Sequence, residues 1–250
     1  MKKKEIKILY LYPDILELYG DYGNIQVLRY RLEQRNIQCS ITSYSIGDVP
    51  PNFSDFDIVF AGGGADQEQG ILANDFMNLK ENIQNAINSG VFFLLICGAY
   101  QLFGKYYKDA DGNEIPGLNI FNYYTIANPD KKQRCIGNAI IETNEGEKVI
   151  GFVNHGGQTY GVDNSFGKVL YGYGNTFENR EEGFQSSNVI ATYFHGPLLS
   201  KNPNIADHII SYALNRKYGE SNFKNIDNSF ESKCREILIN RFLGENNGKI

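Results

Sequence analysis

Cysteine is scarce in this sequence, and its placement excludes several classes of protein. The 250 residues include four cysteines, Cys39, Cys97, Cys135 and Cys234. No two of them form a Cys-x-x-Cys pair, so neither a zinc-binding nor a thioredoxin-like motif is present. They are also too few for a disulfide scaffold. This usage is typical of a reducing compartment, and we expect a cytoplasmic protein.

Long hydrophobic runs and an excess of basic charge are also missing. The apolar run after the basic N-terminus spans residues 6–11 and is interrupted by Lys7, which makes it too short for a signal peptide or a membrane span. Lys and Arg number 24 against 29 Asp and Glu, a net charge of −5. Nucleic-acid-binding proteins usually carry a strongly basic face, so we expect no nucleic-acid partner.

The residues that are abundant favour a large globular core. Hydrophobic residues make up 42% of the chain, with 17 tyrosines and 16 phenylalanines but no tryptophan. No internal repeat and no linker interrupts the sequence. We therefore expect a single domain over residues 1–250, with a C-terminal helical tail at about 226–250.

Strand-like and helix-like runs alternate through residue 104. The strand-like runs are residues 6–12, 39–44, 56–60 and 91–96, and helical spacing occupies 24–35 and 71–87. In the first of these helices we expect Arg29, Arg31 and Arg35 on the solvent side. The alternation predicts an α/β fold with a parallel sheet and helices on both faces.

The pattern changes after residue 104. Strand-like runs with glycine and asparagine between them occupy residues 134–142, 149–153, 168–173 and 188–194. A helix is predicted over 203–217, with Asn202 as its N-cap and Pro203 at its first position. A last amphipathic segment covers 229–243.

Cys97 stands where catalytic nucleophiles are often found. It follows a fully apolar strand directly, and the small residues Gly98 and Ala99 come next. A tight strand-to-helix turn there would present the sulfur, and the start of the following helix would favour a thiolate. The alternative is a buried core cysteine, which is the commoner role for a lone cysteine and the one we assign to the other three.

Gly62, Gly63 and Gly64 form a second strand-end feature. Three glycines let backbone N–H groups point toward one place, as an oxyanion requires, although an ordinary glycine turn has the same sequence. No Gly-Lys-Ser/Thr follows and no G-x-G-x-x-G is completed, which argues against nucleotide binding.

A general base would have to come from the three histidines of the chain, of which two are candidates. His208 lies inside a predicted helix and is expected to be structural. His195 and His155 both follow strand-like runs, in loops where catalytic residues collect. Spacing alone favours His195 only slightly.

Several segments together resemble a known family. They are Leu18–Asn24, Ala61–Gln69, Ile96–Gln101, Gly151–Thr159, Phe194–Leu199 and Leu199–Pro203. In this order the chain resembles triad-type (class I) glutamine amidotransferases of the cobyric-acid-synthase-like branch, and in particular glutaminase subunits of lipid II isoglutaminyl synthases. The resemblance runs from about residue 7 to about residue 217.

The resemblance implies a flavodoxin-like three-layer α/β/α fold and a mechanism. Cys97 would attack the side-chain amide of L-glutamine, and His195 would take the thiol proton and pass it to the leaving ammonia. The N–H of Gly98, with one from Gly63 or Gly64, would hold the oxyanion.

Two further residues are implied as substrate contacts. Arg134 matches the arginine that binds glutamine in the family, and a planar guanidinium suits a carboxylate; the alternative is a solvated charge. Gln101 lies one turn into the helix after Cys97 and would line the pocket, with capping or packing as an equal alternative.

One departure from the family concerns the third member of the triad. Many triad amidotransferases carry His-x-Glu, but Pro197 stands two residues after His195. In the resembled family a partner subunit supplies an acidic residue. We therefore expect no carboxylate of this chain within hydrogen-bond reach of His195, and low activity without the partner.

The expected partner is a Mur-ligase-like synthetase subunit in a heterodimer. By resemblance it would hold ATP and Mg²⁺, receive the ammonia and amidate D-glutamate of the lipid II stem peptide. We expect no cofactor and no metal in this chain. The alternatives are an amidotransferase for a corrinoid acceptor, a cysteine-dependent peptidase or hydrolase, and a non-catalytic binding module on the same fold.

Overall fold

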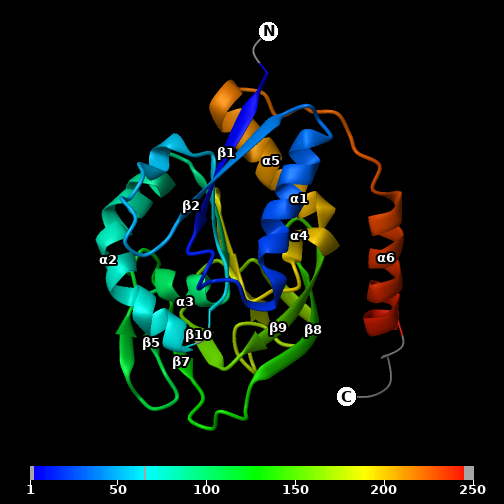
Figure 1. Ribbon diagram of the computed structural model, residues 1–250. Helices are drawn as coiled ribbons and strands as arrows, with labels where there is room; N and C mark the ends of the chain where they lie inside the picture. The colour runs from blue at the N-terminus through cyan, green and yellow to red at the C-terminus, as the bar shows by residue number, and fades with distance from the viewer. Residues whose placement is uncertain (1–2, 65, 245–250) are drawn as a thin grey trace.

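A six-stranded mixed sheet forms the centre of the computed structural model, which describes residues 3–64 and 66–244 (Figure 1). Its strand order is β13-β14-β4-β3-β1-β2, and all neighbours are parallel except β13 and β14. The strands are β1 (Glu5–Leu11), β2 (Gln38–Tyr44), β3 (Ile58–Ala61), β4 (Phe92–Ile96), β13 (Phe184–Ser186) and β14 (Val189–Thr192). Each strand predicted before residue 104 is present, with ends shifted by one or two residues.

Helices cover both faces of this sheet. One face carries α1 (Tyr22–Glu33), α4 (Leu198–Lys201) and α5 (Pro203–Tyr218), and the other carries α2 (Asp66–Asn88) and α3 (Gly98–Phe103) (Figure 1). Every residue of β3 and β4 is buried, as the apolar composition of strands covered on both faces predicts. The predicted three-layer α/β/α fold is confirmed.

Two smaller sheets lie beyond the carboxyl ends of the central parallel strands (Figure 1). The first, β10-β7-β5-β6, contains β5 (Tyr106–Lys108), β6 (Glu114–Pro116), β7 (Tyr124–Ala127) and β10 (Gly157–Tyr160). The second, β12-β11-β8-β9, contains β8 (Cys135–Glu142), β9 (Lys148–His155), β11 (Gly167–Tyr171) and β12 (Glu181–Glu182). Short 3₁₀ turns η1 (Leu18–Gly20) and η2 (Phe53–Asp55) complete the body.

One local prediction is wrong, and another holds in position but not in detail. Arg31 and Arg35 are 2% and 8% exposed rather than solvated, because both pair with Asp207 on α5. Asn202 is the N-cap residue of α5 and Pro203 opens the helix, as predicted, but the Asn202 side chain makes no cap bond. It accepts from the Ile150 N–H and donates to the Ile150 carbonyl, so it fastens β9 to the start of α5.

The predicted tail forms helix α6 (Ser229–Ile239) and a π turn, η3 (Asn240–Gly244), along one side of the molecule (Figure 1). Neither element buries a residue. Arg235 attaches the tail by donating to the carbonyls of Lys148 and Lys201. Residues 245–250 of the predicted tail lie outside the described part of the chain. Among the helices of the described residues, none has the length and apolarity needed to cross a membrane.

Candidate active site

Four adjacent strands deliver the predicted catalytic elements to one edge of the sheet. In the order β14-β4-β3-β1, His195 follows the first strand, Cys97 the second and the Gly62–Gly64 turn the third, while the loop after β1 leads to Asp21. The Cys97 N–H donates to the Thr192 carbonyl at 2.8 Å, which fixes the ends of β4 and β14 against each other. Since the carboxyl ends of parallel strands meet at one edge, residues 174 positions apart lie in contact there.

Cys97 sits in a strained turn between β4 and α3. Its backbone has φ 50° and ψ −101°, outside the regions that a residue with a Cβ ordinarily adopts. Such conformations cost on the order of 1–3 kcal/mol and persist where the surrounding structure imposes them. Cys97 is 6% exposed and lines the cavity described below, as expected of a nucleophile elbow.

His195 is fully buried beside Cys97 and is held from both ends. Its backbone N–H donates to the Phe152 carbonyl at 2.9 Å, and its Nδ1 lies 3.1 Å from both carboxylate oxygens of Asp21. Its Nε2 is buried without a hydrogen-bond partner among the described residues. Burial opposes a charged imidazole, but the Cys97 sulfur and the Asp21 carboxylate outweigh it and raise the pKa of His195 above its usual value.

Asp21 overturns one prediction. We expected no carboxylate of this chain near His195, yet Asp21 is fully buried and hydrogen-bonded to the imidazole. Pro197 takes no part; the acid comes from the start of α1, far away in the sequence. The sequence did contain a signal, because Asp21 belongs to the Leu18–Asn24 segment that carries part of the family resemblance.

Gly63 lies at the centre of this group. A Cβ added there would come within 2.7 Å of His195 Cε1 and 3.2 Å of the Cys97 Cβ. Its N–H donates to Asp21 Oδ2 at 2.9 Å, so in this arrangement it does not point to an oxyanion, contrary to the prediction. Gly98 opens α3, so its N–H has no acceptor within that helix. Gly64 lines the cavity beside Cys97.

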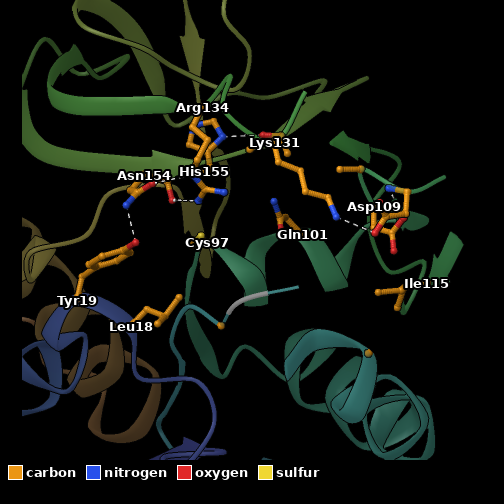
Figure 2. A pocket seen from close by; sticks show the side chains of 16 residues that line it. Leu18, Tyr19, Cys97, Gln101, Asp109, Ile115, Lys131, Arg134, Asn154 and His155 are labelled. Atoms are coloured by element: carbon orange, nitrogen blue, oxygen red, sulfur yellow. Dashed lines mark hydrogen bonds and ion pairs between the residues drawn. The ribbon is translucent and has the colours of Figure 1, made fainter. Parts of the chain in front are cut away.

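A cavity of about 620 Å³ opens above Cys97, between the sheet edge and the two small sheets (Figure 2). Arg134, on the small-sheet side, donates from Nε to Asn154 Oδ1 at 3.1 Å. Gln101 lines the cavity from α3, is 3% exposed and donates to the Tyr193 hydroxyl at 3.1 Å. Both predicted substrate contacts therefore lie in the same cavity as Cys97.

His155 also lines the cavity, but its surroundings differ from those of His195. Its ring stacks on Tyr193 with centroids 3.6 Å apart, and Nδ1 lies 2.6 Å from the Gly157 carbonyl. Burial lowers the pKa of His155 to about 3. A neutral ring stacked and hydrogen-bonded in this way is poorly suited to move protons near neutral pH.

The other cysteines lie outside the site. Cys39, Cys135 and Cys234 are unpaired thiols, and none of them lines the cavity. The predicted core role is confirmed for Cys135, which is buried, but it is wrong for Cys234, which is exposed on α6, and Cys39 is only half-buried. Among the side chains that the structure describes, no group of three or more His, Cys, Asp or Glu gathers as metal ligands would.

Comparison with known proteins places these features in context. The model of the CobB/CobQ-like glutamine amidotransferase domain matches residues 7–203. The subunit GatD of lipid II isoglutaminyl synthase (glutamine-hydrolyzing) from Staphylococcus aureus is 38% identical over 95% of this chain and 96% of its own length. The corresponding subunit from Streptococcus pneumoniae is 39% identical over 86% and 83%. A probable cobyric acid synthase from Methanocaldococcus jannaschii is 30% identical over 61% of this chain and 33% of its own.

Solved structures agree with the fold. PurLQS from Thermotoga maritima aligns over 85% of this chain and 98% of the matched chain, with a TM-score of 0.54 and 16% identity. A structure described as glutamine amidotransferase aligns over 82% and 98%, with a TM-score of 0.55 and 14% identity. At these identities the likeness supports the three-layer fold alone.

Proposed function

The chain belongs to the CobB/CobQ-like glutamine amidotransferase family, and from this we propose that it is the glutaminase subunit of a lipid II isoglutaminyl synthase. It hydrolyses L-glutamine to glutamate and ammonia. The observation that carries the mechanism is His195, held between the Asp21 carboxylate and Cys97 at the base of a cavity that also contains Arg134.

The reaction proceeds in two stages. Cys97 gives its thiol proton to His195 Nε2, and the sulfur attacks the amide carbon of glutamine. When the tetrahedral intermediate collapses, the C–N bond breaks and His195 returns the proton to the departing nitrogen. Ammonia is released, and the glutamyl group remains on Cys97 as a thioester. Water, deprotonated by His195, then hydrolyses the thioester to glutamate and the thiol. Asp21 keeps the imidazole in the tautomer with Nδ1 protonated and stabilises the imidazolium.

The oxyanion and the substrate carboxylate use different donors. The N–H of Gly98, at the start of α3, holds the oxyanion together with a donor from the Gly62–Gly64 turn, in which the Gly63 N–H donates to Asp21. Removal of one such donor typically costs on the order of 10²–10³ in rate. Arg134 binds the α-carboxylate of glutamine from the small-sheet side, and Gln101 contributes to the pocket wall.

The ammonia passes to a Mur-ligase-like synthetase subunit, which holds ATP and Mg²⁺ and amidates D-glutamate of the lipid II stem peptide. Two relatives that match this chain over 83% or more of their own length are named as subunits of such a synthase. The cobyric acid synthase matches over only 33% of its length. This supports the lipid II acceptor over a corrinoid. Cytoplasmic location accords with four unpaired thiols.

Co-expression with the synthetase subunit tests the proposal. The complex should amidate the lipid II substrate with glutamine or with ammonium as the nitrogen source. Cys97→Ala should abolish the glutamine-dependent reaction and leave the ammonium-dependent one, while Cys234→Ala, an exposed cysteine on α6, should change neither. Glutamine-dependent amidation that survives Cys97→Ala would refute the mechanism. Amidation of a corrinoid instead would refute the acceptor.

A further inference from the structure

Tyr19 carries an unusual backbone at the rim of the cavity. It has φ 56° and ψ 27°, in the left-handed region, inside the turn η1. For a residue with a large side chain this conformation is unfavourable and needs support from neighbours. Support comes from the Leu18 N–H, which donates to the Gly63 carbonyl at 3.1 Å, and from the Asp21 N–H, which donates to the Leu18 carbonyl at 3.2 Å.

The strained turn directs the Tyr19 ring onto the predicted base. The Tyr19 and His195 rings meet edge to face, with centroids 4.9 Å apart and planes at 73°. Tyr19 is 47% exposed while His195 is fully buried, so the tyrosine ring stands between the imidazole and solvent. Edge-to-face pairs of this kind contribute beyond the area that they bury.

The hydroxyl of the same tyrosine reaches the predicted glutamine site. It accepts a hydrogen bond from Asn154 Nδ2 (Figure 2). Asn154 in turn accepts from Arg134 twice, at Oδ1 from Nε (3.1 Å) and at its carbonyl from Nη2 (3.2 Å). These bonds leave the Arg134 Nη1 beside Gly156, on the cavity wall. A continuous series of contacts thus joins His195, Tyr19, Asn154 and Arg134.

We propose that Tyr19 is a positioning residue that couples glutamine binding at Arg134 to the placement of His195. The inference rests on the proposed glutaminase function. The hydroxyl acts through Asn154 on Arg134 and therefore on recognition of glutamine. The ring acts on His195 and therefore on the reactivity of Cys97 toward any reagent.

Two alkylating reagents separate these roles on the intact chain. Iodoacetamide is small and neutral and reports the reactivity of the Cys97 thiol. The diazoketone analogue of glutamine carries the α-amino and α-carboxylate groups and also reports recognition. Second-order rates of Cys97 labelling are measured by peptide mass spectrometry, which distinguishes Cys97 from the exposed Cys234. Tyr30, which is 53% exposed on α1, provides the matched control substitutions.

Tyr19→Phe keeps the ring and removes the hydroxyl. Labelling by the diazoketone should slow about three- to tenfold, the usual worth of one hydrogen bond, while the iodoacetamide rate stays within about twofold of wild type. Tyr19→Leu removes the ring as well, and both rates should fall, the iodoacetamide rate by about threefold or more. Tyr30→Phe and Tyr30→Leu should change neither.

Equal slowing of both reagents in Tyr19→Phe, or no slowing of either, would overturn the coupling, because a merely structural tyrosine does not distinguish the two reagents. Failure of the proposed function has a different signature. A wild-type chain that iodoacetamide labels at Cys97 and the diazoketone does not label would overturn glutamine recognition, and this inference with it.

Discussion

Asp21 occupies the N-cap position of α1 without capping it. Aspartate at that position usually accepts a hydrogen bond from the first turn of the helix, but here no such bond forms. The carboxylate instead contacts His195 and the Gly63 N–H, two groups from different strand ends. One buried side chain therefore sets both the orientation of the predicted base and the position of the glycine turn. Departure from a local rule at this residue is typical of a functional site.

Gly63→Ala tests how tightly these groups are packed. The added methyl would overlap His195 Cε1 and press on the Cys97 Cβ, so the base must move. We expect glutamine hydrolysis to fall by about 10²-fold or more, as misplacement of reacting groups by an ångström does. Gly146→Ala, at an exposed turn with no atom near the new methyl, should lose a little stability and no activity. A fully active Gly63→Ala chain would contradict the close contact.

The choice between the two histidines is tested by alanine substitution. His195→Ala should lower glutamate release by about 10²–10⁴, the usual worth of a positioned acid–base group. His155→Ala removes a ring stacked on Tyr193 and should act mainly on stability, measured by thermal unfolding. A greater loss of turnover in His155→Ala at unchanged stability would mean that the base has been misassigned.

At the scale of elements, runs with strong periodicity were predictable and short strands were not. The strands and helices before residue 104 carry long apolar runs, and their burial follows from those runs. Strands β5, β6 and β12 have two or three residues, too few for a period to show, and β6 ends in a proline. The burial of Arg31 was missed because its partner, Asp207, is 176 residues away.

The residues of the candidate site likewise fall into two groups, those that the sequence could suggest and those that it could not. Cys97 and His195 stand at the ends of recognisable strands, so spacing could suggest them. Asp21 lies ten residues after β1, and only the three-dimensional path of the loop brings it to His195. The contacts of Tyr19 with Asn154 and His195 likewise depend on the left-handed turn, which no sequence period reports.

Strand β12 places a buried acid beside β14. Glu182 is fully buried, accepts from the Thr192 hydroxyl and the Tyr193 N–H, and burial raises its pKa to about 7 from 4.5. The folded chain therefore keeps this proton up to about pH 7, whereas the unfolded chain loses it near pH 4.5. The contribution of Glu182 to stability is complete below about pH 4.5 and is lost as the pH rises through about 7.

Glu182→Gln should remove this pH dependence. The amide can keep both contacts without a buried charge. Between about pH 5 and about pH 8, wild type should lose on the order of 2–3 kcal/mol more in free energy of unfolding than the variant. Denaturant unfolding at a series of pH values measures this difference. Parallel profiles for the two proteins would show that Glu182 does not titrate in that range.

Over the whole molecule, the site depends on the body and not on the tail. The cavity is formed between the central sheet and the two small sheets, and α6 lies apart from it along one side (Figure 1). The tail is joined to the body through Arg235, which is hydrogen-bonded to carbonyls of Lys148 and Lys201, and through the Phe242 ring, which packs on Tyr171.

Deletion of residues 229–250 should therefore lower the thermal stability of the protein without changing the reactivity of Cys97. Loss of the Arg235 bonds should lower Tm by roughly 3–10 °C, since such bonds to a charged group are worth about 1.5–3 kcal/mol. The rate of Cys97 alkylation by iodoacetamide should not change. Arg235→Ala should reproduce part of the fall in Tm, and loss of the contact between Phe242 and Tyr171 accounts for the rest. A large fall in Cys97 reactivity in either protein would show that the tail shapes the site.

The central claim is that this chain contains its own triad acid. Glutamate release by the isolated chain at saturating glutamine, wild type against Asp21→Asn, tests it most directly. An asparagine cannot hold the imidazole in the required tautomer or stabilise its charge; in a serine protease with a Ser-His-Asp triad, the same substitution costs about 10⁴ in kcat. We predict a fall of about 10²–10⁴, with the chain still folded. Wild-type turnover in Asp21→Asn, alongside an inactive Cys97→Ala, would contradict the account and return the acid to a partner subunit.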